Sequence, residues 1–313
     1  MEKPIVNKIK AFAPASVANV SCGFDVLGFA MDKIGDTLEI ETNNSGKISI
    51  DKIDGPGNLS TDPLKNVCGV IAIAMLKKLN SNLGLTMKLS KGILPGSGLG
   101  SSAASSVVTA FAINKLFNDV FTPTELVQFA MLGEQLASGT AHADNVAPAL
   151  MGGFTAVRSY EPLDIISIPV PNQLYVVVIH PKIELRTELS RNILKKQVEL
   201  KTAIKQWGNV AGLIAGLYSE NYELIGRSLE DFIIEPTRAV LIPGYAEITK
   251  ASKNAGALGC GISGSGPSIF SLCKGEQNAL SVSQAIEIEA NKLDLPFDIH
   301  ISKISVQGTR VID

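Results

Sequence analysis

The chain has 313 residues, of which 45% are hydrophobic and 19% charged, and its formal net charge at pH 7 is −2. This composition excludes an intrinsically disordered chain, and the balanced charge argues against a general binder of nucleic acids or anionic membranes. No stretch of about 20 apolar residues is free of charges and glycines, so no transmembrane helix is expected. The first residues also lack the pattern of a signal peptide. We therefore expect a cytoplasmic protein.

The cysteines and histidines do not have metal-site spacing. Four cysteines stand at positions 22, 68, 260 and 273, none in a CxxC pair, and the chain has three histidines. A zinc site needs clustered ligands, so none is expected. Buried free thiols in a reducing compartment are the interpretation that this pattern favours.

The first half of the chain predicts strands and helices in mixed order. Strand patterns occupy 36–42, 47–53, 84–93 and 154–159, and segment 8–20 opens with strand-like alternation before a proline and small residues. Helices are expected at 66–80, 102–118 and 122–139, with a short one within 143–153. The alternation in 36–42 and 47–53 indicates antiparallel strands with one solvated face. Thr122, Pro123 and Glu125 form a strong helix start, with an N-cap, a first-turn proline and a capping box.

The second half begins after a stretch of charges and prolines at 158–172, which indicates a crossing between two domains. We then expect a buried strand at 173–181, two or three helices within 187–232 and a further helix at 244–255. A glycine-rich turn that leads into a strand is expected at 256–270, followed by a helix at 278–294 and a final strand at 299–307. Strands and helices do not alternate strictly, which predicts an α+β fold. The predicted domains are 1–165 and 166–313.

Residues 94–104, LPGSGLGSSAA, lie between a predicted strand and a predicted helix. This order suits an anion site, because glycines expose backbone N–H groups and the helix start is electropositive. No lysine follows as in a Walker A loop, and Ser101 stands where a dinucleotide fingerprint needs its third glycine. A close-packed turn without a ligand is the alternative.

A second glycine-rich segment matches G-x-G-x-x-G at Gly259, Gly261 and Gly264. The residues before it are predicted to be helical and those after it extended. A dinucleotide fingerprint requires the reverse order, strand then glycines then helix, so we reject that interpretation. A tight helix-to-strand turn is expected here, beside the first glycine loop. Whether it contacts phosphate stays open.

Segments 14–28, 94–104 and 259–270 together resemble the three-motif signature of the GHMP kinase superfamily. The first motif and segments 134–154 and 235–244 are most similar to the homoserine kinase family within it. The resemblance implies an ATP-binding N-terminal domain like domain 2 of ribosomal protein S5. It also implies a ferredoxin-like GHMP kinase C-terminal domain.

The reaction implied by the resemblance is ATP-dependent phosphorylation of L-homoserine to O-phospho-L-homoserine, on the route to threonine. ATP and Mg²⁺ are the implied cofactors, with Asn66 near the adenine and Ser102 and Glu134 as magnesium ligands. The implied phosphate-binding residues are Pro95, Gly96, Ser97, Gly98, Leu99, Gly100, Ser101 and Ser102.

The implied acceptor site has residues for each end of a zwitterion. Asn19, Asp25 and Asp144 match positions for the ammonium and hydroxyl end. Arg191 and Arg238 match a carboxylate clamp, since two guanidiniums can grip a carboxylate through several charge-assisted hydrogen bonds. Thr187 is expected to hydrogen-bond the acceptor.

The implied catalytic residues are Asp144, Glu134 and Asn145. In the mevalonate kinase branch an aspartate matching Asn145 is thought to take the hydroxyl proton, which asparagine cannot do. The sequence therefore favours catalysis by positioning and charge stabilisation. Whether Asp144 accepts the proton stays open. For His142 a structural hydrogen bond to a loop carbonyl is expected.

Two alternatives remain. One is another kinase of the superfamily, of the mevalonate or shikimate type. The other is a catalytically inactive nucleotide-binding sensor of the same fold. Neither a nucleic-acid partner nor a membrane is expected, and the resemblance makes a homodimer possible.

Overall fold

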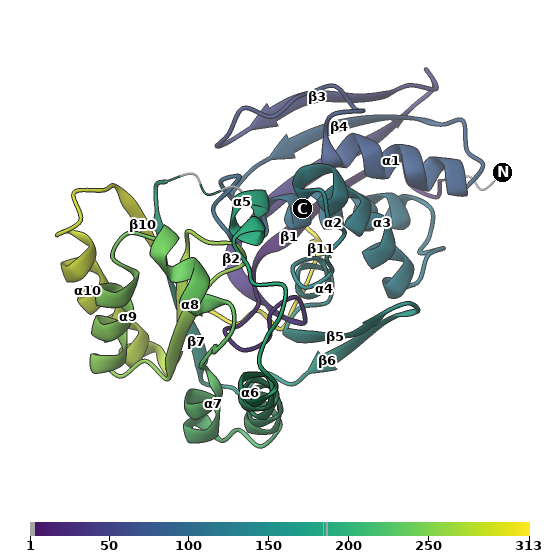
Figure 1. Cartoon of the computed structure of the whole chain (residues 1–313). Helices are drawn as coiled ribbons and strands as arrows, with labels where there is room; N and C mark the ends of the chain where they lie inside the picture. Colours follow the sequence, from purple (N-terminus) through teal and green to yellow (C-terminus); the bar gives the residue numbers. More distant parts are fainter. Residues whose placement is uncertain (1–3, 184, 186) are drawn as a thin grey trace.

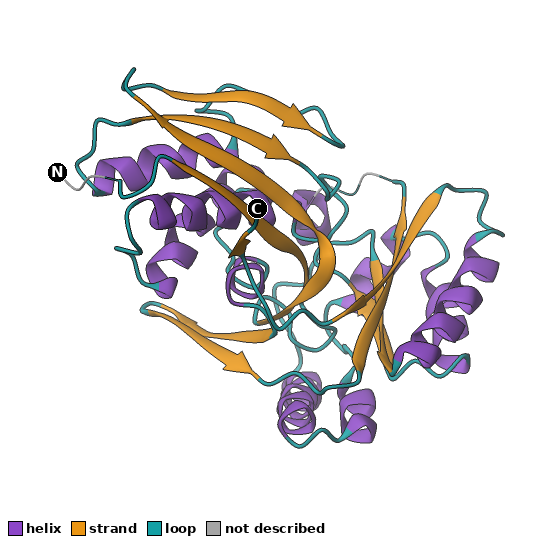
Figure 2. Ribbon diagram, turned by 180° about the vertical axis from the view of Figure 1, so that it is seen from behind, coloured by secondary structure: helices purple, strands orange, loops and turns teal. Residues whose placement is uncertain are grey.

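A computed structural model of the chain describes residues 4–183, 185 and 187–313. Two β-sheets lie side by side, each with helices against it (Figures 1 and 2). The fold is the expected mixture of helix and sheet, and the α+β prediction is confirmed. In the described part of the chain, the helices are too short or too polar to span a lipid bilayer.

The first sheet has strand order β11-β1-β2-β4-β3, and β2 also pairs with β5, which pairs with β6. Its strands are β1 (Lys8–Ala18), β2 (Leu27–Asn43), β3 (Ile48–Asp54), β4 (Gly84–Ser90), β5 (Phe154–Tyr160), β6 (Leu163–Ile168) and β11 (Arg310–Val311). Strand β2 is antiparallel to β1 and β4, as predicted. The antiparallel prediction is wrong for β3, which runs parallel to β4. Helix α1 lies between β3 and β4 in the chain, and such a crossover returns the chain in the same direction.

Four helices belong to this sheet, and Figure 2 shows them on its far side. They are α1 (Val67–Lys78), α2 (Ser101–Leu116), α3 (Pro123–Ser138) and α4 (Val146–Met151). The capping box at the start of α3 is present as predicted. Helix α2 is central and buried on nearly all sides, which its small residues allow. Helix α3 comes so near that a Cβ on Gly133 would lie 2.0 Å from Ser106 Oγ.

The second sheet is antiparallel with strand order β10-β7-β9-β8. Its strands are β7 (Leu174–Pro181), β8 (Gly259–Ile262), β9 (Ile269–Lys274) and β10 (Phe297–Lys303). The helices of the same part of the chain are α5 (Thr187–Asn192), α6 (Leu200–Tyr218), α7 (Tyr222–Ser228), α8 (Glu235–Arg238), a 3₁₀ turn (Ala239–Leu241), α9 (Tyr245–Asn254) and α10 (Glu276–Ala290). The fourth, first, third and second strands are neighbours, which is the expected ferredoxin-like arrangement. Helices α9 and α10 cover its outer face (Figure 1).

The chain passes between the sheets after β6, near the end of the 158–172 segment. The expected division after residue 165 falls inside β6, which pairs with β5 and stays with the first sheet. The C-terminal strand β11 also returns to pair with β1. We propose residues 169–173 as the crossing, with the last residues belonging to the first unit.

The second glycine-rich segment differs from the predicted helix-to-strand turn, because Gly259–Ile262 already form β8 and the turn joins two strands. As predicted, this turn lies against the first glycine loop. Ser263 Oγ donates to the Gly98 carbonyl at 2.7 Å. Ser268 Oγ donates to the Ser97 carbonyl at 2.6 Å. The two loops thus join the N-terminal and C-terminal units directly.

Gly98 lies at this junction with φ +82°, and a Cβ there would be 2.6 Å from the Ser263 carbonyl oxygen. Gly139 has nearly the same φ, +78°, with no described atom within 4 Å of an added Cβ. Both alanine variants suffer left-handed strain of about 1–2 kcal/mol. Gly98→Ala also forces the loops apart, so we expect it to lose about 1–3 kcal/mol more unfolding free energy in denaturant titrations. Equal losses would show that the loop junction is not tightly packed.

Candidate active site

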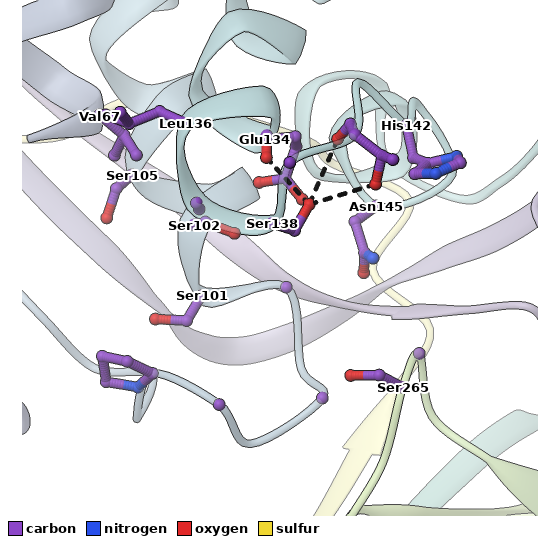
Figure 3. Close-up of a pocket in the computed structure, with 18 of the residues that line it drawn as sticks. Val67, Ser101, Ser102, Ser105, Glu134, Leu136, Ser138, His142, Asn145 and Ser265 are labelled. Atoms are coloured by element: carbon purple, nitrogen blue, oxygen red, sulfur yellow. Dashed lines mark hydrogen bonds between the residues drawn. The ribbon is translucent and has the colours of Figure 1, made fainter. Parts of the chain in front are cut away.

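A cleft of about 1070 Å³ lies where the two units meet. The first glycine loop, the start of α1, the end of α3, the loop after β1 (residues 19–26), α8 and the second glycine turn all line it. Figure 3 shows lining residues from α1, α2, α3 and the second glycine turn. Most residues predicted from the sequence line it, namely Asn19, Asp25, Asn66, Pro95, Gly96, Gly98, Gly100, Ser101, Ser102, Glu134, Asp144, Asn145, Arg191 and Arg238. The tertiary structure thus brings together residues that are more than 200 positions apart.

Three residues predicted for the site are not among the described residues that line the cleft. Leu99 is buried in the hydrophobic core and does not line the cleft. Ser97 is also buried, and its hydroxyl accepts a 3.3 Å hydrogen bond from the Leu99 N–H, so both shape the loop from behind. Thr187 begins α5, but its side chain lies outside the described part of the structure.

The first glycine loop and α2 form an anion-binding geometry at one end of the cleft. Gly96, Gly98 and Gly100 all have positive φ, between 66° and 82°, so the loop turns tightly. Gly100 is the N-cap of α2 and supplies no side chain to cap it. The first N–H groups of α2 therefore remain available to an anion, and the helix dipole favours one there.

Lys91, the lysine nearest to this loop in sequence, is fixed beneath it. Its ammonium pairs with the Asp36 carboxylate, and both side chains are buried. It also donates to the Ser101 carbonyl at 2.9 Å and to Ser105 Oγ at 2.8 Å. Asp36 accepts a further 3.0 Å bond from the Gly92 N–H. This ion pair ties the entry of the loop and the first turn of α2 to β2.

Asn66, predicted to lie near the adenine, is the N-cap of α1. Its Oδ1 accepts from the Cys68 N–H at 2.9 Å, and its Nδ2 donates to the Ser60 carbonyl at 2.8 Å. The side chain therefore holds the wall of the cleft in shape. Four neighbours that no sequence motif marks also line the cleft, namely Leu59, Leu64, Lys65 and Val67.

Glu134 and Ser102 lie on adjoining helices, α3 and α2 (Figure 3). Glu134 is 8% exposed, and its Oε1 has no hydrogen-bond partner among the described residues. Burial raises the pKa of Glu134 to about 7, although the Ser102 hydroxyl and Lys91 act in the opposite direction. An unpartnered buried carboxylate oxygen beside a hydroxyl suits a hard cation. Within residues 4–183, 185 and 187–313, no three His, Cys, Asp or Glu side chains cluster as metal ligands.

The other end of the cleft carries two arginines and an acid. Arg191 makes a two-pronged ion pair with Asp25, at 3.0 and 2.6 Å. Arg238 is 2% exposed and donates to the carbonyls of Ser190 at 3.0 Å and Gly264 at 3.2 Å. Burial and the nearby Arg191 lower the pKa of Arg238 to about 10.

Phe24 was not identified from the sequence, although it adjoins Asp25 in the first motif. The guanidinium carbons of Arg191 and Arg238 lie 5.3 and 5.0 Å from its ring centroid. Both distances fall within the range of cation–π attraction. The ring thus helps to hold two like charges in the same region of the cleft.

Asn19 shapes the first-motif loop. It has a φ of +72°, its Nδ2 donates to the Gly264 carbonyl at 2.6 Å, and its Oδ1 accepts from the Asp25 N–H at 3.0 Å. The first of these bonds reaches the second glycine turn. Asn19 therefore sets the position of Asp25 relative to that turn.

Asp144 and Asn145 lie between the two ends of the cleft. Asp144 is 4% exposed, and burial together with the charges of Asp25 and Glu134 raises its pKa to about 7. Asn145 Oδ1 accepts from Ser16 Oγ at 2.8 Å. A carboxyl group that titrates near neutrality in a cleft is a candidate for acid–base chemistry.

The expected hydrogen bond from His142 to a loop carbonyl is not found, because neither ring nitrogen has a partner among the described residues. The ring packs edge-on against Tyr160 instead, and Nδ1 lies 3.8 Å from Asp25 Oδ1. Burial lowers the pKa of His142. The Tyr160 hydroxyl donates to the Asp25 carbonyl and accepts from the Ala143 N–H, each at 3.3 Å.

Comparison with known proteins identifies the family to which the chain belongs. Residues 66–153 match the model of the GHMP kinases N terminal domain, and residues 213–292 match that of the GHMP kinases C terminal domain. The chain is 43% identical to homoserine kinase of Chloroherpeton thalassium, over 98% of this chain and all of that protein. It is 44% identical to that of Chlorobium phaeobacteroides, over 97% of this chain and 99% of that protein.

Solved structures of kinases also superpose on this chain. The crystal structure of homoserine kinase from Cytophaga hutchinsonii superposes with a TM-score of 0.95 at 48% identity, covering 98% of each chain. A mevalonate kinase from L. major superposes with a TM-score of 0.75 at 17% identity, covering 97% of this chain and 99% of that one. The second likeness concerns the fold alone.

The raised pKa of Asp144 makes stability depend on pH. Between pH 3.8 and about 7 the native state keeps a proton that the unfolded chain has released, so the unfolding free energy falls as pH rises. One group contributes a slope of at most about 1.4 kcal/mol per pH unit. We expect denaturant titrations from pH 4 to 7 to show a shallower fall for Asp144→Asn than for the native chain. Asp51→Asn, an exposed change on β3, is the control and should keep the native slope. Native-like slopes in both variants would contradict the assignment.

Proposed function

Because the chain belongs to the homoserine kinase family of the GHMP kinases, we propose that it transfers the γ-phosphoryl group of ATP to L-homoserine. The product is O-phospho-L-homoserine, a precursor of threonine. The observation that carries the proposal is one cleft with an anion-binding helix start at one end and paired cationic and anionic side chains at the other. Asp144 lies between them, where a hydroxyl acceptor would meet the phosphoryl group.

The ATP phosphates are assigned to the first glycine loop. Within residues 95–102, backbone N–H groups from Gly96 onward and the positive end of α2 together stabilise phosphate charge, and Pro95, which has no N–H, lines the cleft beside them. The second glycine turn lines the same cleft through Gly264 and Ser265. Adenine is assigned to the wall around Asn66 and Leu64, where Leu64 is 70% exposed.

Mg²⁺ is assigned to Glu134 and Ser102. The unpartnered Oε1 of Glu134 fits such an ion, and phosphate oxygens and water would provide the remaining ligands. When bound, Mg²⁺ neutralises charge on the phosphates during transfer. The raised pKa of Glu134 reflects the cost of leaving that carboxylate unpaired, and a cation would remove this cost.

L-Homoserine is assigned to the end that contains Asp25, Arg191 and Arg238. Asp25 and Arg191 neutralise each other in the structure. A zwitterion can replace this contact by presenting its ammonium to Asp25 and its carboxylate to the two guanidiniums. The exchange gives the ammonium and both carboxylates partners of opposite charge, which is necessary in a partly buried site. Thr187 is retained as a proposed acceptor contact.

Catalysis is assigned chiefly to positioning and electrostatic stabilisation, because phosphoryl transfer passes through a loose transition state. We assign to Asp144 the task of orienting the acceptor hydroxyl and accepting its proton. Its pKa near neutrality suits this role. Asn145 has no basic group and is assigned to hold Ser16 and the wall beside Gly100.

Two wider properties belong to the same proposal. We propose that the enzyme acts in the cytoplasm, and its four cysteines, which are buried free thiols, suit a reducing compartment. A homodimer, which the family resemblance implies, remains a prediction that analytical ultracentrifugation tests.

The activity is tested by coupled measurement of ADP release from ATP and Mg²⁺. We expect release to depend on L-homoserine and to be much weaker with mevalonate, shikimate, L-serine or L-threonine, because homoserine alone among them joins an ammonium, a carboxylate and a primary hydroxyl at the right separation. Transfer to mevalonate in preference to homoserine would contradict the proposal. ATP binding without transfer to any acceptor would instead indicate a sensor.

The magnesium assignment is tested with Glu134→Gln, which keeps size and removes charge. We expect kcat to fall about 10²–10³-fold, as when one electrostatic contact to the transition state is lost. Gln135→Ala changes an exposed neighbour on the same helix and should retain native activity. The melting temperature of both variants should stay near that of the native chain. A native kcat for Glu134→Gln would remove Glu134 from the metal site.

A further inference from the structure

The cleft has a polar support behind its acceptor end that the proposed chemistry does not use. Glu235 is the first residue of α8, one turn before Arg238, and does not line the cleft. Its carboxylate joins three segments that do line the cleft or lead into it. These are the loop after β1, the end of β8 and α8 itself.

The contacts of Glu235 are specific. Its Oε1 accepts a hydrogen bond from the Ile262 N–H at 2.9 Å and another from Ser21 Oγ at 3.3 Å. Its Oε2 accepts from the Tyr245 hydroxyl at 3.0 Å. A Cβ on Gly261 would lie 2.3 Å from Oε1, so the glycine lets the carboxylate approach the strand. Three donors from three elements thus converge on one side chain.

A second acid fixes Glu235 in turn. Asp231 is buried, and its Oδ2 accepts from the Glu235 N–H at 2.9 Å. Its Oδ1 accepts from Gln206 Nε2 at 2.9 Å, and the same Nε2 donates to the Cys22 carbonyl at 2.9 Å. The loop after β1 is therefore attached to the region of α8 at two consecutive residues, Ser21 and Cys22.

The segment that Ser21 belongs to needs external support. Asn19, Val20 and Ser21 have positive φ values of 72°, 42° and 59°, although none is glycine. Such conformations cost free energy and persist where the surroundings hold them. Phe24 and Asp25 lie three and four residues further along the same loop. The Phe24 ring lies near the guanidiniums of Arg191 and Arg238, and Asp25 pairs with Arg191. A shift of Ser21 would therefore move these groups relative to Arg238.

From this arrangement we propose that Glu235 is a positioning residue for recognition of the acceptor carboxylate, holding the loop of Asn19–Asp25 and the end of β8 at a fixed distance from Arg238. The proposal rests on the assignment of Arg238 to the homoserine carboxylate. Glu235 acts through other residues and touches no reacting atom. Burial and the charge of Asp231 raise the pKa of Glu235 to about 7, so the site keeps an acid where an apolar side chain would cost less desolvation.

The test compares three single variants by steady-state kinetics. Glu235→Gln keeps the shape but weakens the convergent bonds. Ser21→Ala cuts the bond to the loop after β1, and Tyr245→Phe cuts the bond to α9, which does not line the cleft. We expect the KM for L-homoserine to rise on the order of tenfold in Glu235→Gln and severalfold in Ser21→Ala, because displacement of a distant support misplaces the binding groups. The KM for ATP should change less than twofold in each variant.

Tyr245→Phe is the matched control and should keep the native KM for L-homoserine, although it removes a bond to the same carboxylate. Calorimetric binding of L-2-aminobutyrate, which has the ammonium and carboxylate but no hydroxyl, gives a second readout and should weaken by the same factor as the KM rises. If Glu235→Gln does not fold, Ser21→Ala decides the question.

Equal rises in the KM values for ATP and homoserine would overturn the proposal and indicate a general structural role. A Tyr245→Phe effect as large as that of Ser21→Ala would also overturn it. If ADP release by the native chain did not depend on L-homoserine, that result would contradict the proposed function instead. The failure of the proposed function and the failure of this proposal are therefore distinguishable.

Discussion

The junction of the two glycine-rich loops is the constraint on which the cleft depends. The turn between β8 and β9 lies against residues 97–98 through hydrogen bonds from Ser263 and Ser268 to backbone carbonyls. Side chains at Gly98 would push these backbones apart. Because the junction joins the N-terminal and C-terminal units, it also sets how far the first turn of α2 lies from Arg238. A phosphate site on one unit thereby faces an acceptor site on the other.

Charge within the cleft follows from burial. Glu134 and Asp144 both have a pKa raised to about 7, chiefly by removal from water, and Arg238 has a pKa lowered to about 10 for the same reason. Each group gains a favourable state when a ligand of opposite charge arrives. A cation beside Glu134 and a zwitterion beside Asp25 and the arginines would both do so. The site is therefore built to hold charged ligands, and the cost of its unpaired charges is part of the binding free energy of those ligands.

The hydrogen-bond networks around the cleft divide into two supports. Lys91 and Asp36 hold the first glycine loop to β2 from beneath. Asp231, Glu235 and Gln206 hold the loop after β1 to α8. Both supports are buried or partly buried polar groups with defined partners, which fixes geometry more narrowly than apolar packing does. The phosphate and acceptor ends can thus keep their separation while the ligands exchange.

The sequence by itself determined the elements and most of the site. Periodicity and caps located α1, α3 and α10 within a few residues, and the spacing of Gly96, Gly98 and Gly100 before a small-residue helix indicated an anion site. These are local properties, set by backbone freedom and by helix-terminus chemistry. The three motifs added the family, and with it the grouping of Asn19, Glu134, Asp144 and the arginines.

Only the tertiary structure decided the rest. The parallel pairing of β3 with β4 depends on which neighbour a strand meets, and its own alternation cannot specify this. Leu99 faces the core, His142 lacks the expected carbonyl partner, and Phe24 lies beside both guanidiniums, because side-chain direction is set by contacts between distant segments. The same holds for Glu235, whose donors lie 27, 10 and 214 positions away. The local sequence determines the chemistry that each residue can provide, and long-range packing determines which other residues it contacts.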